Sequence, residues 1–185
     1  MNDSSTNFCF DATLLCPKDF GDTSSWAFIV LPYEVSAKLP RRGRTSIVGT
    51  LNNQKFSALL EPDGQKSHWL KIDEPLLQKA GTHYGEVAQF EIKAVAKEPE
   101  PALPSDLTEA LQNAPAAKAL WDNITTIARI DWIHWIVSAK QTKTRQKRIH
   151  DACEMLTSGK KQVCCFDSSG FYNKALSAPA TANET

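Results

Sequence analysis

The stretch Lys97-Glu98-Pro99-Glu100-Pro101-Ala102-Leu103-Pro104 separates two parts of the chain that follow different patterns. Proline has no N–H to donate to a sheet ladder and does not fit a helix interior, so its prolines interrupt both kinds of element. Before the stretch apolar residues recur with a period of two, typical of strands, and after it with a period near 3.6, typical of helices. We therefore predict an α+β fold with a small β-barrel at residues 8–97, a linker at 98–104, a helical unit at 105–176 and a disordered tail at 177–185.

The composition is that of a globular protein without a net charge. Lys and Arg number 21 and Asp and Glu number 21, so no overall field favours nucleic acid or a membrane surface. The first residues lack the basic and apolar regions of a signal peptide, and the longest apolar run, residues 26–31, is too short to cross a bilayer. Five cysteines without a Cys-x-x-Cys pair favour reduced thiols. We expect a soluble, cytoplasmic protein without a transmembrane segment.

Short apolar or alternating segments, divided by turns, make up the first part. Asn52-Asn53 lies between two of them and predicts a hairpin, because asparagine tolerates positive φ. In a later segment we expect Trp69 to fill the barrel, which would turn His68 outward. The predicted strands cover residues 8–15, 26–31, 44–50, 54–60, 67–72 and 87–96. Strands with this spacing indicate a small closed or nearly closed barrel.

The second part is predicted to be helical. Asp106 and Glu109 have the spacing of a capping box at the start of its first helix. A helix that begins near Thr125 or Thr126 is apolar around most of its circumference. We expect it to be buried against the barrel, another helix or a second subunit, with the barrel as the nearest surface. The last helix covers residues 142–158 and has a basic exposed side.

Two groups of residues carry a resemblance to known bacterial families. The first resembles a small-barrel family catalogued as a domain of unknown function, through Trp26-Ala27-Phe28-Ile29-Val30-Leu31-Pro32, Val35-Ser36-Ala37-Lys38-Leu39-Pro40, Arg42-Gly43-Arg44, Val48-Gly49-Thr50, Pro62-Asp63-Gly64 and His68-Trp69-Leu70. The second resembles the YdeI/OmpD-associated, or bacteriocin-protection, helical segment, through Pro104-Ser105-Asp106-Leu107, Ala110-Leu111, Trp132-Ile133, Ala139-Lys140, Thr144-Arg145 and Arg148-Ile149. The resemblance implies a double-split β-barrel and an association with protection against membrane-acting agents, and it implies no catalytic residues.

Arg41, Arg42 and Arg44 surround Gly43 and form the sharpest charge cluster of the first part. Guanidinium groups bind phosphate and carboxylate through paired hydrogen bonds, so these arginines are candidates for an anion site. The alternative is a solvated loop that leads into a strand.

A second group of cations lies on and just before the last predicted helix: Lys140, Lys143, Arg145, Lys147 and Arg148. These residues are candidates for contact with a partner protein or a polyanion. No aromatic residue lies within residues 143–148, so we do not expect nucleic acid to bind there. The alternative is a solvated helix face with pairs such as Lys147 and Asp151, and with the head of Arg148 in water.

Histidine and cysteine residues give no defined site. Asp131 precedes His134 by three residues and His150 precedes Glu154 by four, which favours helix-surface pairs over catalysis. No side chains have the spacing of a metal site, and we predict no metal and no cofactor. Cys164-Cys165 lies near lysines that lower a thiol pKa, which makes a redox role conceivable, but no positioned base accompanies it.

These observations favour a non-enzymatic binding protein for a small anion or a partner protein, and the resemblance adds a link to bacteriocin or envelope-stress protection. Two alternatives stay open. One is a nucleic-acid-binding regulator, by analogy with other double-split barrels. The other is an enzyme with a site between barrel and helices. The sequence does not identify the ligand or the partner, and oligomerisation is compatible with it.

Overall fold

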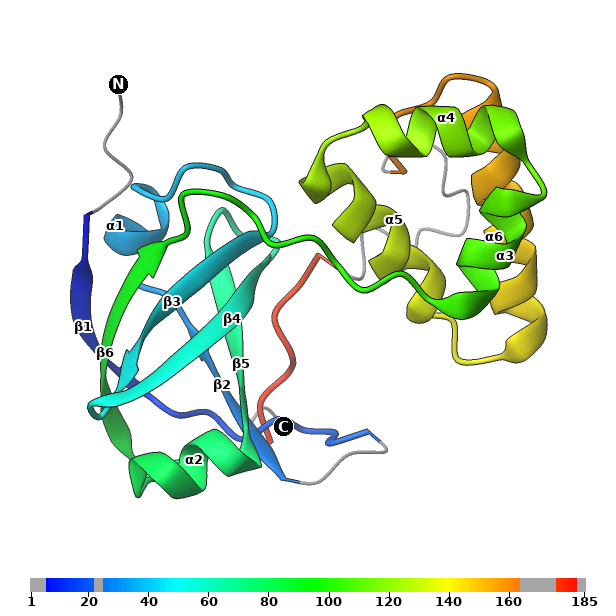
Figure 1. Ribbon diagram of the computed structural model, residues 1–185. Helices are drawn as coiled ribbons and strands as arrows, with labels where there is room; N and C mark the ends of the chain where they lie inside the picture. The colour runs from blue at the N-terminus through cyan, green and yellow to red at the C-terminus, as the bar shows by residue number, and fades with distance from the viewer. Residues whose placement is uncertain (1–5, 22–24, 164–175, 183–185) are drawn as a thin grey trace. The chain divides into compact units, whose positions relative to one another are not determined.

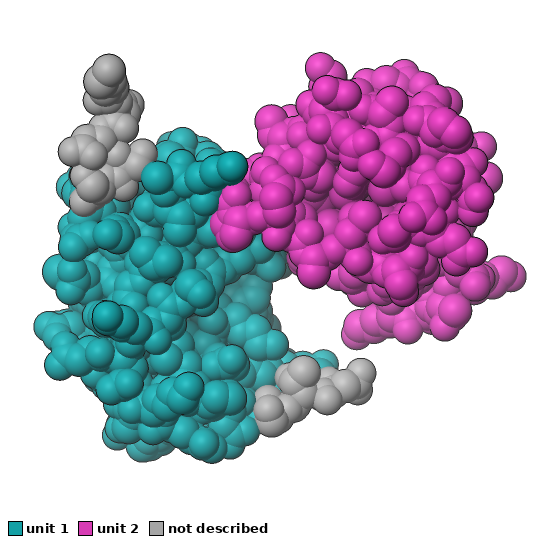
Figure 2. All heavy atoms as spheres, in the orientation of Figure 1, with its two compact units in different colours: residues 1–97, 173–185 teal, residues 98–172 magenta. Residues whose placement is uncertain are grey.

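The computed structural model describes residues 6–21, 25–163 and 176–182. The chain divides into two compact units, shown in different colours in Figure 2. Unit 1 comprises Met1–Lys97 and Asn173–Thr185, and unit 2 comprises Glu98–Tyr172. Each unit has its own cluster of buried apolar side chains.

Unit 1 is built on an antiparallel sheet with the strand order β1-β6-β3-β4-β5-β2 (Figure 1). The strands are β1 (Phe8–Thr13), β2 (Trp26–Val30), β3 (Thr45–Leu51), β4 (Gln54–Pro62), β5 (His68–Asp73) and β6 (Val87–Ala94). Two short helices, α1 (Tyr33–Ser36) and α2 (Glu74–Ala80), connect strands of this sheet. Together with the helices of unit 2, the sheet confirms the predicted α+β fold.

The two outer strands of the sheet approach each other at Leu15 and Phe28. These residues exchange backbone hydrogen bonds of 2.8 and 3.0 Å. Leu15 lies just beyond β1 and Phe28 lies in β2, so the sheet curls into a partial barrel. Its interior is filled by fully buried side chains that include Ile29, Ile47, Leu51, Leu60, Leu70, Phe90 and Ile92.

The hairpin predicted at Asn52-Asn53 is confirmed. The two asparagines connect β3 to β4 with φ of 45° and 67°. Positive φ at both loop positions matches the twist of paired strands, and asparagine adopts it at low cost. The Asn52 side-chain oxygen also accepts a hydrogen bond from the N–H of Gln89 at 2.9 Å, which ties the loop to β6.

The expected orientation of β5 is wrong. His68 is 1 % exposed and faces inward with Leu70 and Ile72, whereas Trp69 lies on the other face and contacts the Phe28 ring edge-on at 6.3 Å between centroids. His68 Nε2 lies 3.0 Å from the Gly43 carbonyl oxygen, and its Nδ1 lies 2.7 Å from the Ser36 hydroxyl. A carbonyl can only accept, so Nε2 carries the proton and Nδ1 accepts from the hydroxyl. Two available polar partners therefore allow a histidine where a tryptophan was expected.

Unit 2 consists of α3 (Ser105–Gln112), α4 (Pro115–Asn123), α5 (Thr126–Val137) and α6 (Thr142–Thr157). Helix α5 is apolar as predicted, and the other helices of its own unit supply the surface that buries it. Trp132 is fully buried, and its indole N–H donates to the Lys161 carbonyl at 3.3 Å. The core of unit 2 contains Leu107, Leu111, Ala117, Trp121, Ala128, Trp132, Trp135, Ile136, Ile149, Ala152 and Leu156. Of the three surfaces considered for α5, the structure therefore shows another helix.

The capping box predicted at Asp106 is wrong. Helix α3 begins two residues earlier than this capping box requires, with Pro104 as its N-cap, and no side chain caps it. The Asp106 carboxylate instead accepts two hydrogen bonds from Arg145 of α6, at 2.7 and 3.0 Å. A partner far away in the sequence has thus replaced the local one.

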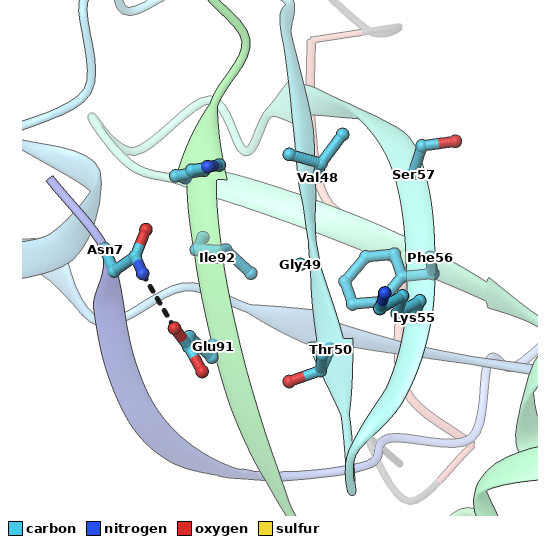
Figure 3. A pocket seen from close by; sticks show the side chains of 10 residues that line it. Asn7, Val48, Gly49, Thr50, Lys55, Phe56, Ser57, Glu91 and Ile92 are labelled. Atoms are coloured by element: carbon cyan, nitrogen blue, oxygen red, sulfur yellow. Dashed lines mark hydrogen bonds between the residues drawn. The ribbon is translucent and has the colours of Figure 1, made fainter. Parts of the chain in front are cut away.

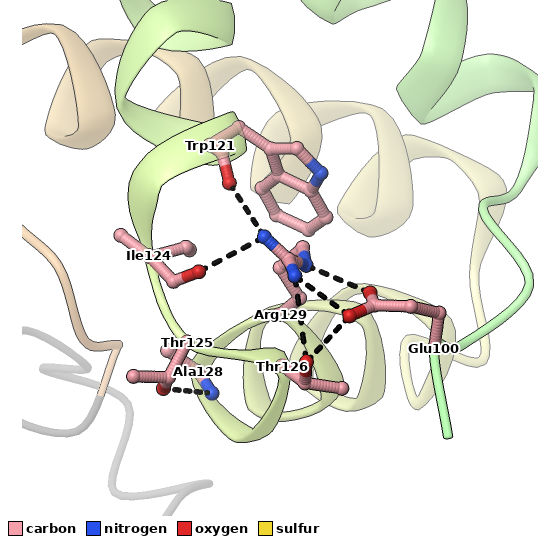
Figure 4. Close-up of polar contacts among 7 residues, drawn as sticks. All are labelled: Glu100, Trp121, Ile124, Thr125, Thr126, Ala128 and Arg129. Carbon is pink, nitrogen blue, oxygen red and sulfur yellow. Dashed lines mark hydrogen bonds and ion pairs between the residues drawn. The ribbon is translucent and has the colours of Figure 1, made fainter. Parts of the chain in front are cut away.

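The Pro-rich stretch interacts with unit 2 rather than running free. The Arg129 guanidinium donates to both carboxylate oxygens of Glu100, at 3.1 and 2.9 Å (Figure 4). It also donates to the carbonyls of Trp121 and Ile124, at the turn between α4 and α5, at 3.1 and 2.9 Å. One arginine thereby joins the start of the unit to two of its helices.

The C-terminal segment differs from the expected disordered tail over residues 176–182. This segment, red in Figure 1, runs along unit 1. It forms a bridge between Thr181 and Pro17 and donates from Ala178 N–H to the Asp63 carbonyl at 3.2 Å. Backbone pairing orders it although its side chains are small.

We predict that Trp132→Ala lowers the free energy of unfolding by about 3–5 kcal/mol, because the substitution leaves a cavity in the core of unit 2. Urea denaturation followed by helical circular dichroism measures this loss. Val137→Ala, at the exposed end of the same helix, is the control and should change stability by less than about 1 kcal/mol. Equal losses for the two variants would contradict the packing described for α5.

We also predict a pH effect from His68. Burial lowers the pKa of its imidazole below the ordinary value of 6.5, against the raising effects of the Gly43 hydrogen bond and Asp63. Below about pH 6.5, His68 is therefore protonated more readily in the unfolded chain than in the folded protein. The free energy of unfolding then falls as the pH drops below that value, by at most about 1.4 kcal/mol per pH unit. Denaturation of the wild type and of His68→Gln between pH 7.5 and 5 tests this. The variant should be less stable at pH 7.5 and should have a flatter profile; parallel profiles would contradict the assignment.

Candidate functional site

A hollow in unit 1 lies over β3, β4 and β6, with a volume of about 610 Å³ (Figure 3). It is lined by Asn7, Val48, Gly49, Thr50, Lys55, Phe56, Ser57, Glu91, Ile92 and Lys93. These residues come from three paired strands and from the residue before β1, so the sheet itself sets their spacing.

The strand register arranges the lining residues in two rows across the sheet. In the first row, Val48 of β3 lies between Lys93 of β6 and Ser57 of β4. In the second row, Thr50 lies between Glu91 and Lys55 on the same strands. Directly opposed side chains in a sheet are about 5 Å apart, so each row places a hydroxyl or an apolar group within reach of a lysine.

Of the charged side chains that line the hollow, the carboxylate has a hydrogen-bond partner and the two lysines have no ion-pair partner among the described residues. The Glu91 carboxylate accepts a hydrogen bond from the Asn7 side chain at 2.8 Å (Figure 3). Lys55 and Lys93 are exposed, and neither forms an ion pair within the residues that the structure describes. The hollow thus presents two ammonium groups that are available to a ligand, next to one carboxylate that already has a partner.

Gly49 occupies the middle of the hollow because a larger residue does not fit there. A Cβ at this position would overlap the Glu91 carbonyl oxygen of the neighbouring strand. Its partners across the sheet are Phe56 on β4 and Ile92 on β6. The missing side chain lets the backbone of β6 approach, and Figure 3 shows the bare backbone of Gly49 between the other lining side chains.

The arginines predicted for an anion site have different surroundings. Arg44 is buried, with its guanidinium 3.7 Å from the Glu61 carboxylate. Arg42 is exposed and lies 3.4 Å from the Lys66 carbonyl, and Arg41 is half-buried. The charge of Arg44 is therefore balanced by Glu61 on a neighbouring strand, and the anion site predicted in this loop stays a prediction.

The sequence analysis did not find the pair Lys55 and Lys93, because these residues lie 38 positions apart. Only the pairing of β3 with both of its neighbours brings them together.

The basic residues around α6 also divide into two groups. Arg145 binds Asp106, and its hydrogen bonds lower the pKa of that carboxyl. Arg148 donates to the Trp135 carbonyl at 2.6 Å and lies over the Trp135 ring at 5.3 Å, so the expectation of a solvated Arg148 head is wrong. Lys147 pairs with Asp151 at 2.6 Å, as predicted. Lys140 and Lys143 are exposed, which leaves few cations on this helix for a polyanion.

The remaining candidates add no site. His150 lies 3.5 Å from Glu154 on an exposed helix face, as predicted. Cys164 and Cys165 lie outside the described residues. Among the residues that are described, no three His, Cys, Asp or Glu side chains gather as metal ligands would. Within the same ranges, every helix is too short or too polar to pass through a bilayer.

A second hollow, of about 350 Å³, lies beside Arg129 in unit 2. Its walls include Glu100, Trp121 and Asp122. The chain's own oxygens already occupy the donors of this guanidinium, as Figure 4 shows. The hollow of unit 1 is therefore the better candidate for a ligand.

We predict that Gly49→Ala lowers the free energy of unfolding of unit 1 by about 1–3 kcal/mol, because the added methyl group forces β3 and β6 apart. Thermal or chemical denaturation measures the loss. Gly43→Ala is the matched control, because nothing lies within 4 Å of its added Cβ and no unusual φ is present there. If Gly49→Ala is as stable as this control, the close approach of the two strands is incorrect.

Comparisons with known proteins agree with the two units. Residues 10–92 match the family described as a domain of unknown function, DUF1905. Residues 100–159 match the family described as bacteriocin-protection, YdeI or OmpD-associated. No curated protein matches the chain. The predicted resemblance is confirmed in both parts: along the chain, the match to DUF1905 precedes the match to the YdeI/OmpD-associated family.

Proposed function

We propose that the protein is a binding protein for a small anion and that unit 1 holds this ligand in the hollow over β3. The observation that carries the proposal is the pair of exposed lysines, Lys55 and Lys93, without an ion pair in the described ranges, on either side of a hollow. Two ammonium groups attract phosphate or carboxylate and leave its oxygens free to accept further hydrogen bonds.

The size of the hollow supports a small molecule. Binding sites for small ligands have volumes of about 300–1,000 Å³, and that of this hollow is about 610 Å³. The two rows of side chains cross β6, β3 and β4, so a ligand can contact three strands at once. Apolar surface from Val48 and Phe56 adds area that a bare inorganic ion would not use.

The polar groups narrow the ligand class further. The hydroxyls of Thr50 and Ser57 both donate and accept hydrogen bonds. The Glu91 carboxylate accepts only, so it favours a ligand that also carries hydroxyl or amine donors. A small phosphorylated or carboxylated compound that carries hydroxyl or amine donors fits these polar groups better than a plain anion.

A role in protection against bacteriocins also forms part of this proposal. It rests on the description of the family that unit 2 matches.

The experiment measures stabilisation by anions, because a ligand that binds only the folded state raises the melting temperature. We expect millimolar phosphate and a hydroxylated dicarboxylate such as malate to raise the melting temperature of unit 1, the hydroxylated anion more strongly. The double variant Lys55→Gln/Lys93→Gln should lose most of this rise.

Two control variants make the result specific. Lys38→Gln/Lys79→Gln removes the same charge from exposed positions of unit 1 outside the hollow and should keep the rise. Arg42→Gln separates the hollow from the arginine loop that the sequence suggested. A rise that survives in Lys55→Gln/Lys93→Gln, or that disappears equally in the control, would overturn the proposal.

A further inference from the structure

The C-terminal segment is held on unit 1 by its backbone. Lys18 N–H donates to the Ala180 carbonyl at 2.8 Å, and Ala182 N–H donates to the Cys16 carbonyl at 2.9 Å. A third bond runs from Ala178 N–H to the Asp63 carbonyl at 3.2 Å. Backbone bonds of this kind do not depend on side-chain identity, and they are how extended peptides add to the edge of a sheet.

Pro17 fits the position that it occupies in this pairing. It forms a bridge with Thr181, and the hydrogen bonds on either side come from its neighbours, Cys16 and Lys18. A residue in such a non-hydrogen-bonded pair needs no N–H, so proline costs nothing there. The edge thus pairs with one extended segment although it contains a proline.

The surface that receives the segment is formed by contacts within unit 1. On one side, Leu15 is fixed to Phe28 by two backbone hydrogen bonds. On the other side, the Asp63 carboxylate accepts from the N–H groups of Gln65 and Ser67, at 2.7 and 2.8 Å, which holds the turn in shape. Neither set of contacts involves the C-terminal segment, so both can form without it.

Gly64 sets the closest approach of the segment. A Cβ at this position would overlap the Leu176 carbonyl oxygen. The residues that follow Leu176 are Ser177, Ala178, Pro179, Ala180, Thr181 and Ala182, of which all but the proline have small side chains. The site therefore combines main-chain hydrogen bonds with a close backbone contact that the missing side chain of Gly64 permits.

We propose that residues 16–18 and the turn at Asp63–Gly64 form a binding site for an extended peptide whose side chains after the first residue are small, and that residues 176–182 of the chain are its resident occupant. The site requires backbone N–H groups at the positions of Ala178 and Ala182, and none at Pro179. A peptide with the same chemistry, supplied in trans, competes for the same surface. This site is separate from the anion hollow and does not depend on it.

The experiment uses the full chain with its own segment weakened. Ala178→Pro/Ala182→Pro removes both donated N–H groups, and a labelled synthetic peptide of residues 176–185 is then titrated, with fluorescence anisotropy as the readout. We expect the peptide to bind this variant in the micromolar to low millimolar range and to bind the wild type at least tenfold more weakly, because the wild-type site is occupied. No binding to the variant at 5 mM peptide would overturn the proposal.

Two matched pairs separate the site from nonspecific binding. A peptide N-methylated at Ala182 should lose binding, whereas one N-methylated at Ala180, whose N–H makes no hydrogen bond to any described residue, should bind as the parent does. Gly64→Ala in the same chain should abolish binding, whereas Gly21→Ala, with a similar φ of 66° and nothing within 4 Å of its added Cβ, should preserve it. Equal behaviour within either pair would contradict the geometry.

Discussion

The pairing of β3 with two neighbours, β4 and β6, is the constraint on which unit 1 depends. Ile47 and Leu51 of this strand are fully buried in the core, and Gly49 between them allows the backbone of β6 to come close. The same register places Val48 and Thr50 on the floor of the hollow. Core and candidate site therefore share one strand, and a register shift by one residue would lose both, because it exchanges the two faces.

Unit 2 depends instead on arginines that satisfy backbone and carboxylate oxygens at helix ends. Arg129 binds the Glu100 carboxylate and two carbonyls where α4 ends. Arg145 joins α6 to α3 through Asp106, and Arg148 binds the Trp135 carbonyl near the end of α5. Carbonyls at a helix C-terminus have no partner within the helix, so a guanidinium there offsets a real desolvation cost. These basic side chains stabilise the helical unit and are less available to a partner.

Local sequence patterns made the fold predictable. The features that were predicted wrongly depend on contacts between residues that lie far apart in the sequence. The period of two before Lys97 and the asparagine pair at 52–53 correctly indicated strands and a hairpin. The orientation of His68 was not predictable, because it depends on Ser36 and the Gly43 carbonyl, which lie in other segments. The capping box failed for the same reason, since Arg145 bonds to Asp106 across the unit.

The difference between local patterns and long-range contacts also explains why the candidate site was not predicted from the sequence. Arg41, Arg42 and Arg44 are conspicuous because they are adjacent, but adjacency along a loop says nothing about which charge is already balanced, and Glu61 lies beside Arg44. Lys55 and Lys93 are unremarkable in sequence, each flanked by ordinary strand residues. Only when β3 is paired on both sides do they flank one hollow. In a sheet, the cations that can serve a ligand are those whose cross-strand neighbours leave them unsatisfied, and this property belongs to the register rather than to any local motif.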